Sequence, residues 1–231
     1  MDPDAAPTPL VARDEGRHPA GAGPWWAERW WFGWWEPGTA ATGAAGGFAE
    51  LVLLPNQARA WYRAALVRAG EPLLAVVDHE VPVPRVGLEL RGEGLWADHT
   101  VEAPFEQWTV ANETYALAVD DHDELVGRGY GRPVPLAFDV EWYASAAPVR
   151  HAGGYEQAGE VVGVVELGGT ANHAVHGLSA RGHDWGPLLL PALGEPGAAG
   201  GVVVPDRWPA PFDLVVDDVL TATGWRRGRR P

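Results

Sequence analysis

Carboxyl groups placed among tryptophans are the residues of this sequence that could do chemistry. The stretch 94–120 carries Glu102 and Glu106 together with His99, and its remaining residues are largely those of a protein core. Burial in apolar surroundings raises the pKa of a carboxyl group and keeps a proton available near neutral pH. We therefore expect Glu102 and Glu106 to be candidate general acids, and His99 to be a third candidate catalytic residue.

The alternative is that these acids simply face water. If residues 95–102 form a strand, Asp98 and Glu102 lie on one face, and Leu95 and His99 lie on the other. Charged side chains are mostly exposed in folded proteins. For each carboxylate taken singly, the exposed position is the favoured one, so both interpretations stay open at this point.

Several other chemistries are disfavoured by the residues themselves. The chain has no cysteine, no Gly-rich phosphate loop, and neither of its serines, Ser145 and Ser179, lies in a Gly-x-Ser-x-Gly motif. His173 and His176 are three residues apart and would point to opposite faces of a strand. We therefore expect neither a metal nor another cofactor. A net charge of −14 repels phosphates and disfavours nucleic acid as a partner.

The elements that must position these residues read as short strands. Residues 134–143 and 155–167 alternate between apolar and polar positions, and Pro or Gly separates most of the apolar runs. Only 57–68 and 109–119 would also suit a helix. The pattern predicts an all-β antiparallel barrel or sandwich with at most two short helices.

The composition changes along the chain and suggests three parts. Residues 1–23 are rich in Ala, Pro and Gly and predict a flexible tail, and residues 24–186 predict the β domain. Residues 187–231 predict a Pro/Gly-rich extension with one possible strand. Between positions 25 and 35 the chain carries six of its thirteen tryptophans, a density that must be covered by other parts of the fold.

Four motifs resemble one known family. They are LWADH (95–99), PFEQWT (104–109), RGHDWG (181–186) and the Trp-rich WWFGWWE (30–36). Together they are similar to the lipocalin-related family that includes carotenoid 1,2-hydratase (hydroxyneurosporene synthase) and AttH-like proteins, over about residues 25–186. The family pattern at the last motif reads Arg-Asp-His-Ser-Trp-Gly, so Gly182 and Asp184 depart from it.

The resemblance implies a calycin/lipocalin-like barrel around an apolar cavity, with the family's second barrel truncated or absent in a chain of this length. It also implies water addition to polyenes or cyclisation in secondary metabolism. By motif position it singles out Trp96, His99, Glu106, Trp108, Arg181, His183 and Trp185. Arg181 could equally form a buried structural pair with Glu106.

The residues and the resemblance together predict binding of a hydrophobic isoprenoid, polyketide or steroid-like molecule in a Trp-lined pocket. The expected ligand-binding residues are Trp61, Trp96, Trp108, Tyr115, Trp142, Arg181, His183 and Trp185. One alternative is a cofactor-independent hydratase, isomerase or cyclase that uses a buried carboxylate as general acid. Another is a non-catalytic interaction module whose surface tryptophans between residues 25 and 35 dock a partner protein.

Location and assembly follow from what the sequence lacks. The N-terminal residues do not read as a signal peptide, and the chain has no run of 18 apolar residues that could span a membrane. The expectation is a cytoplasmic protein. A homodimer could form.

Overall fold

The computed structural model describes residues 9–36, 45–68, 70–120, 131–168 and 172–189, and the backbone of 202–203, 210–216 and 219–226. These residues form β-strands and two short 3-10 turns, η1 (Ala12–Glu15) and η2 (Pro55–Gln57), without an α-helix. The strands in chain order are β1 (Trp26–Glu36), β2 (Ala45–Leu54), β3 (Arg59–Arg68), β4 (Leu73–Pro82), β5 (Leu90–Gly92), β6 (Leu95–Ala103), β7 (Gln107–Val119), β8 (Arg132–Ala144), β9 (Val149–His151), β10 (Gly154–Leu167), β11 (His173–Leu189), β12 (Val202–Val203), β13 (Ala210–Val216) and β14 (Val219–Arg226).

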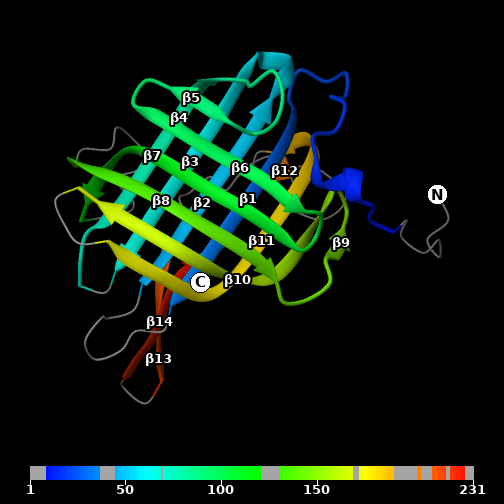
Figure 1. The fold of residues 1–231 in the computed structure, drawn as a ribbon. Coiled ribbons are helices and arrows are strands. Elements are labelled where there is room, and N and C mark those ends of the chain that lie inside the picture. The colour runs from blue at the N-terminus through cyan, green and yellow to red at the C-terminus, as the bar shows by residue number, and fades with distance from the viewer. Residues whose placement is uncertain are drawn as a thin grey trace.

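The large sheet curves and closes on itself (Figure 1). Neighbouring strands run β11-β1-β2-β3-β4-β7-β8-β10, and β10 pairs again with β11. All of these pairings are antiparallel, whereas the short pairing of β11 with β12 is parallel. The predicted all-β antiparallel barrel is confirmed, and the described residues contain no second barrel.

The ring has one weak seam, beside β4. This strand pairs with β7 only over Leu73 to Ala75, and then the two strands separate. β6 pairs with the first part of β7 and with β5, and within the described sheet it has no pairing with β4. Along this line the wall of the barrel is therefore held by side chains rather than by a continuous ladder of hydrogen bonds.

The two segments that would also suit a helix are strands. Residues 59–68 form β3 between β2 and β4. Residues 107–119 form β7, which pairs with β8 over most of its length. Helix propensity is a weak preference that tertiary pairing overrides. In β3 Ala60 and Ala64 are fully buried members of the barrel core.

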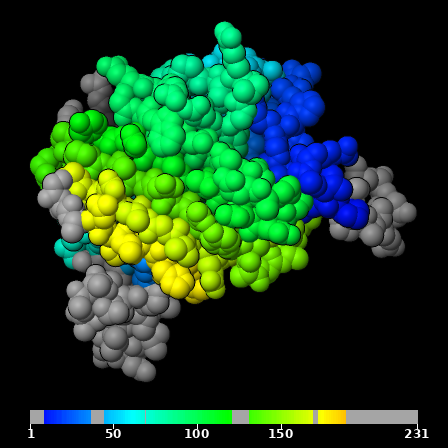
Figure 2. Space-filling view, viewed as in Figure 1, coloured from blue at the N-terminus to red at the C-terminus, as the bar shows by residue number. Residues whose placement is uncertain are grey.

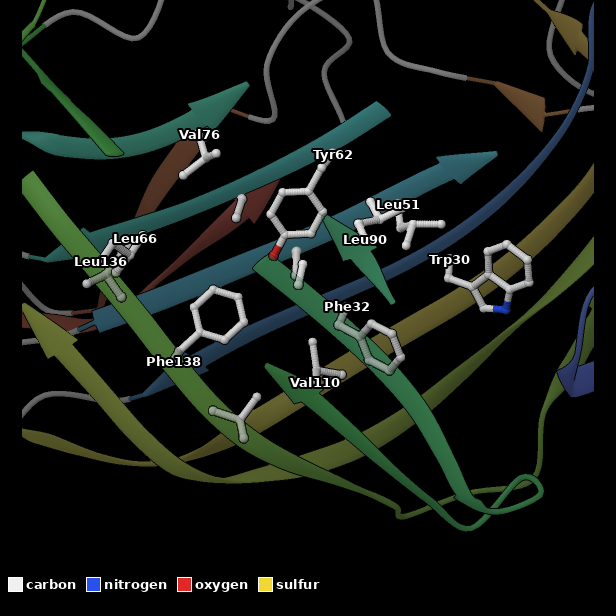
Figure 3. Packing of buried hydrophobic residues seen from close by; sticks show 14 of the residues in the cluster. Trp30, Phe32, Leu51, Tyr62, Leu66, Val76, Leu90, Val110, Leu136 and Phe138 are labelled. Carbon is white, nitrogen blue, oxygen red and sulfur yellow. The ribbon is translucent and has the colours of Figure 1, made fainter. Parts of the chain in front are cut away.

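The interior is a continuous apolar core. On β1 Trp30 and Phe32 point inwards, and Val110 and Phe138 lie on the opposite wall (Figure 3). Trp34, the next alternate residue of β1, belongs to the same core. The prediction that the early tryptophans must be covered is confirmed for five of the six, and Trp25 is the exception. The surface tryptophans expected for an interaction module are not found at most of these positions, because Trp30, Trp31 and Trp34 are buried and, of the six, only Trp25 is more than half exposed, at 55%.

The N-terminal segment is part of the barrel rather than a tail. Residues 9–23 lie against its body (Figure 2), and η1 contacts β7, β10 and β11 through Glu15. Glu15 at the end of η1 is 1% exposed, and the Arg17 guanidinium donates a hydrogen bond of 2.8 Å to the Pro84 carbonyl. The expectation of a flexible tail over 1–23 is wrong for its described part, and residues 1–8 lie outside the described residues.

The C-terminal part differs from its prediction in two ways. β11 continues to Leu189, beyond the predicted boundary at 186, and the last apolar run forms a hairpin, β13–β14, instead of one strand. β14 lies beside β1 and β2. The part of the chain that the structure describes holds no helix with the length and hydropathy needed to cross a membrane.

Candidate functional site

One end of the barrel is closed by a buried ion pair between η1 and β11. The Arg181 guanidinium donates from Nη2 to Glu15 Oε1 at 2.6 Å and from Nη1 to Glu15 Oε2 at 3.1 Å. Trp108 and Tyr155 donate to the same carboxylate at 2.7 and 2.9 Å. Charges this deep are tolerated because the carboxylate is paired and its oxygens are hydrogen-bonded.

The Arg181 side chain is also held by aromatic faces. Its guanidinium carbon lies 4.7 Å from the Trp142 ring centroid and 5.3 Å from those of Trp108 and Tyr155. The Gln157 side-chain carbonyl accepts a further hydrogen bond of 2.6 Å from Nη2. This cluster of charge and rings holds Arg181 in place at the closed end.

Two histidines share one carboxylate next to this ion pair. His18 Nδ1 and His183 Nε2 lie 2.7 and 2.9 Å from the same oxygen, Glu28 Oε1. Burial opposes ionisation of Glu28, but hydrogen bonds with His18 and His183 outweigh it and hold the pKa of Glu28 below its ordinary value. Burial likewise lowers the pKa of His183, against the contact with Glu28 that raises it.

A different set of polar groups lies within the apolar interior, away from the closed end. His99 is 2% exposed, and neither of its ring nitrogens has a hydrogen-bond partner among the residues that the structure describes. Phe32 from β1 and Tyr62 from β3 pack edge-on against it, with ring centroids 5.5 and 6.2 Å away. Burial lowers the pKa of His99 to about 3, so the ring is neutral near neutral pH.

Tyr62 and Asn112 complete this polar set. The Asn112 side chain lies near the Tyr62 hydroxyl, but neither that hydroxyl nor the Asn112 Nδ2 completes a hydrogen bond within the described structure. The Tyr62 hydroxyl points into the interior (Figure 3). Each unpaired buried polar group costs about 1–3 kcal/mol. In a native protein such a cost calls for a functional explanation.

The end of the barrel opposite η1 carries two grooves that meet at Tyr115. A groove of about 450 Å³ runs along the seam between β4 and β6 and is lined by Val76, Val77, Leu95 and Tyr115. A neighbouring groove of about 520 Å³ lies between β7, β8 and β10. Both share Gly94, Thr114 and Tyr115 in their walls, and Tyr115 is 65% exposed.

Two strands each carry both a groove residue and an interior residue beside the polar groups. On β6, Leu95 lines the seam groove, and Ala97 and His99 follow it on the same inward face. From Leu95 to His99 the strand advances four positions, which is about 13 Å at ~3.3 Å per residue. On β8, Leu136 lines the second groove, and Phe138, the next inward residue, donates its backbone N–H to Asn112 Oδ1 at 3.2 Å.

Comparison with known proteins gives one result. Residues 12–190 match the family described as a domain of unknown function, DUF7064. The chain belongs to the DUF7064 family. No curated protein and no solved structure was found to match it. The DUF7064 match begins at the first residue of η1, so it includes both the segment that closes the barrel and all strands of the ring.

In this DUF7064 protein the predicted acids are not inside. Glu102 and Glu106 are both exposed, and Glu102 accepts a hydrogen bond of 3.0 Å from the Thr109 hydroxyl. The premise that these two side chains are buried among apolar groups is therefore wrong. The predicted alternation in β6 is confirmed, but the face that carries Glu102 is the solvent face, and Glu106 lies in the turn between β6 and β7. The pairing of Arg181 with Glu106 is also wrong, because the partner of Arg181 is Glu15.

The other predicted residues fall into three places. His99 lies buried in the interior beside Phe32 and Tyr62. Four residues lie buried towards the closed end: Trp108, Trp142, Arg181 and His183. Trp185 stacks on His18 outside that end, with ring centroids 4.0 Å apart. Tyr115 borders both grooves, whereas Trp61 packs on the outer face beside His79, and Trp96 donates to exposed Glu89 at 3.0 Å. Trp61 and Trp96 are therefore not brought to the interior or the grooves.

Sequence reasoning missed Glu15, His18 and Glu28 at the closed end, and Tyr62 and Asn112 inside. Glu15 and His18 lie in a stretch whose composition resembles a flexible tail, and no local pattern marks them. Asn112 and Glu28 did have a signal. Asn112 is a polar residue on the inward face of β7, and Glu28 lies two residues before the Trp-rich run of β1, which is buried on both faces. A polar residue at such a position indicates a buried group with a specific partner.

Proposed function

We propose that this protein binds a small, largely apolar molecule that enters at the seam beside β4 and places its polar group against His99, Tyr62 and Asn112. The observation that carries the proposal is the set of unpaired polar atoms on these three side chains within an otherwise apolar interior. Binding sites for small molecules have this composition, with a few polar groups in an apolar wall. A ligand that hydrogen-bonds these groups would remove their desolvation cost.

The seam supplies the route. β4 and β7 are joined by only three residue pairs at this end, so the wall can widen there without breaking a long ladder. Val76 and Leu95 border the groove on its outside and belong to the interior core on their other side. Entry therefore requires these two side chains to move apart, which exposes the path along β6 to His99.

The class of ligand follows from the lining. Trp34, Phe32, Phe138 and Trp108 favour a molecule with apolar or π-rich surface, as the isoprenoid, polyketide and steroid-like compounds have. His99 as a neutral ring and the Tyr62 hydroxyl can each donate or accept one hydrogen bond. A hydroxyl or carbonyl group on the ligand fits them, and a charged group does not.

The experiment is a titration of tryptophan fluorescence with a panel of such compounds, since Trp34, Trp108 and Trp142 lie in the interior. We expect at least one compound to change the emission, and His99→Leu to bind it about tenfold more weakly, equivalent to one lost hydrogen bond of ~1.4 kcal/mol. His176→Gln, at an exposed position on β11, is the matched control and should bind as the wild type does.

Two results would count against the proposal. Either no compound in the panel changes the fluorescence, or His99→Leu and the wild type bind the same compound equally well. An enzymatic role for Glu102 or Glu106 is not proposed, because both side chains are on the solvent face.

A further inference from the structure

The donor atoms of His18, Glu28 and His183 converge at the closed end, apart from the interior site proposed above. The His18 and His183 nitrogens and the Glu28 oxygen all lie within 4.8 Å of one another. Two imidazoles and one carboxylate are the ligand set of many transition-metal sites, including catalytic zinc sites. Three residues from an N-terminal segment and two different strands provide it here, so the fold and not a local motif assembles the group.

The tautomer of His183 is fixed by its other ring nitrogen. His183 Nδ1 lies 2.9 Å from the Asp14 backbone carbonyl, which can only accept, so Nδ1 carries the proton. In the neutral ring Nε2 then has a lone pair, and it points at Glu28 Oε1, which is also an acceptor. Two lone pairs at 2.9 Å need a positive centre between them, either a proton or a metal ion.

The surroundings of the three groups resemble the outer shell of a metal site. A metal-binding histidine usually donates its second ring N–H to a carbonyl or carboxylate, which sets the ring orientation. His183 donates to the Asp14 carbonyl, and the Asp14 carboxylate lies 3.8 Å from His18 Nε2. Trp30 stacks on His183 and Trp185 stacks on His18, with centroid distances of 4.3 and 4.0 Å, so both rings are held in place.

Access is from one side. The side chains of Glu28 and His183 are 1% and 0% exposed, whereas that of His18 is 20% exposed. An ion could therefore reach the group past His18. A site with three protein ligands and an open side leaves one position for water, as in zinc sites that do chemistry.

We propose that His18, Glu28 and His183 bind one divalent transition-metal ion, with Zn²⁺ the best match to two nitrogens and one oxygen. The ion takes the place between the facing lone pairs of His183 and Glu28, and His18 closes the site from the N-terminal segment. Binding therefore ties residues 14–18 to β1 and β11.

The test uses the full chain without an affinity tag, treated with a chelator and then titrated with Zn²⁺ in a calorimeter. We expect one ion per chain. His18→Gln should lower the affinity by more than about 100-fold, since even outer-shell changes cost about 10–100-fold. His176→Gln makes the same chemical change at an exposed position on β11 and should leave the Zn²⁺ affinity unaltered. Co²⁺ gives a second readout, through visible absorption bands that report four-coordinate geometry and that His18→Gln should abolish.

The wild type failing to bind Zn²⁺, or His18→Gln binding it with unchanged affinity, would overturn the proposal. We expect His18→Gln to fold, because it leaves the buried contact between Glu28 and His183 intact. Glu28→Gln is a second variant, and circular dichroism of both shows whether a lost signal reflects a lost ligand or a lost fold. None of these outcomes bears on compound binding at His99, which is measured separately.

Discussion

Glu15 and Arg181 form a buried ion pair that joins the N-terminal segment to the last strand of the barrel, across 166 residues of sequence. Both carboxylate oxygens of Glu15 accept from the guanidinium, and Trp108 and Tyr155 complete its hydrogen bonds. The pair closes one end of the ring. It also explains why residues 12–18 belong to the domain.

Replacement of Glu15 by Gln should destabilise the protein strongly, because Arg181 would keep its charge in a site with 1% exposure and no counter-ion. Breaking a buried pair on one side costs about 3–5 kcal/mol. Urea unfolding measures this change in the free energy of unfolding. Glu106→Gln makes the same chemical change at an exposed position and should stay within about 0.5 kcal/mol of the wild type. Equal effects of the two substitutions would show that the buried pair contributes nothing.

The position of Glu15 could not be predicted from the sequence. Its neighbours are the Ala, Pro and Gly of a segment that resembles a tail, and the partners that bury it come from β7, β10 and β11. Burial of this residue is a property of the closed barrel end, and no window of sequence around position 15 contains that information.

The unfolding free energy should fall as the pH is lowered from 6.5, owing to His99. Its pKa is about 3 in the folded protein and ~6.5 in the unfolded chain, so the unfolded chain binds the proton first. The contribution of neutral His99 to the unfolding free energy is complete above pH 6.5. It is lost as the pH falls towards 3, at no more than about 1.4 kcal/mol per pH unit. Between pH 6.5 and 5.0 the wild type should lose about 1–2 kcal/mol more than His99→Leu. Parallel pH profiles of the two proteins would contradict a buried neutral His99.

The inner face of β2 needs glycine at position 47. A Cβ at Gly47 would lie 1.8 Å from the Trp34 ring, whereas one at Gly33 would lie 4.0 Å from its nearest neighbour, Phe48. Gly47→Ala should therefore destabilise by about 1–3 kcal/mol through overpacking. Gly33→Ala, on the adjacent strand, should be neutral or slightly stabilising. Thermal unfolding of both variants checks this, and an unchanged melting temperature for Gly47→Ala would mean that Trp34 can move aside.

Much of the strand pattern could be predicted, and its limits are physical. Alternation in 134–143 correctly placed Phe138 and Trp142 inside, because period-2 burial is a local property of a strand beside a core. The same alternation in 95–102 separated Glu102 from His99 but could not say which face was wet. For residues 59–68 the local preference was ambiguous, and the neighbouring strands β2 and β4 decided it.

The most direct test of the central claim is the stability of Tyr62→Phe, measured without ligand and with a compound that binds the wild type. The substitution removes only the hydroxyl, which has no hydrogen-bond partner in the described structure. Without ligand the variant should be as stable as the wild type or more so, because no hydrogen bond is lost. With saturating compound the wild type should gain more stability than the variant. A loss of more than about 1 kcal/mol in the ligand-free variant would show that the hydroxyl already has a partner, and would contradict the account.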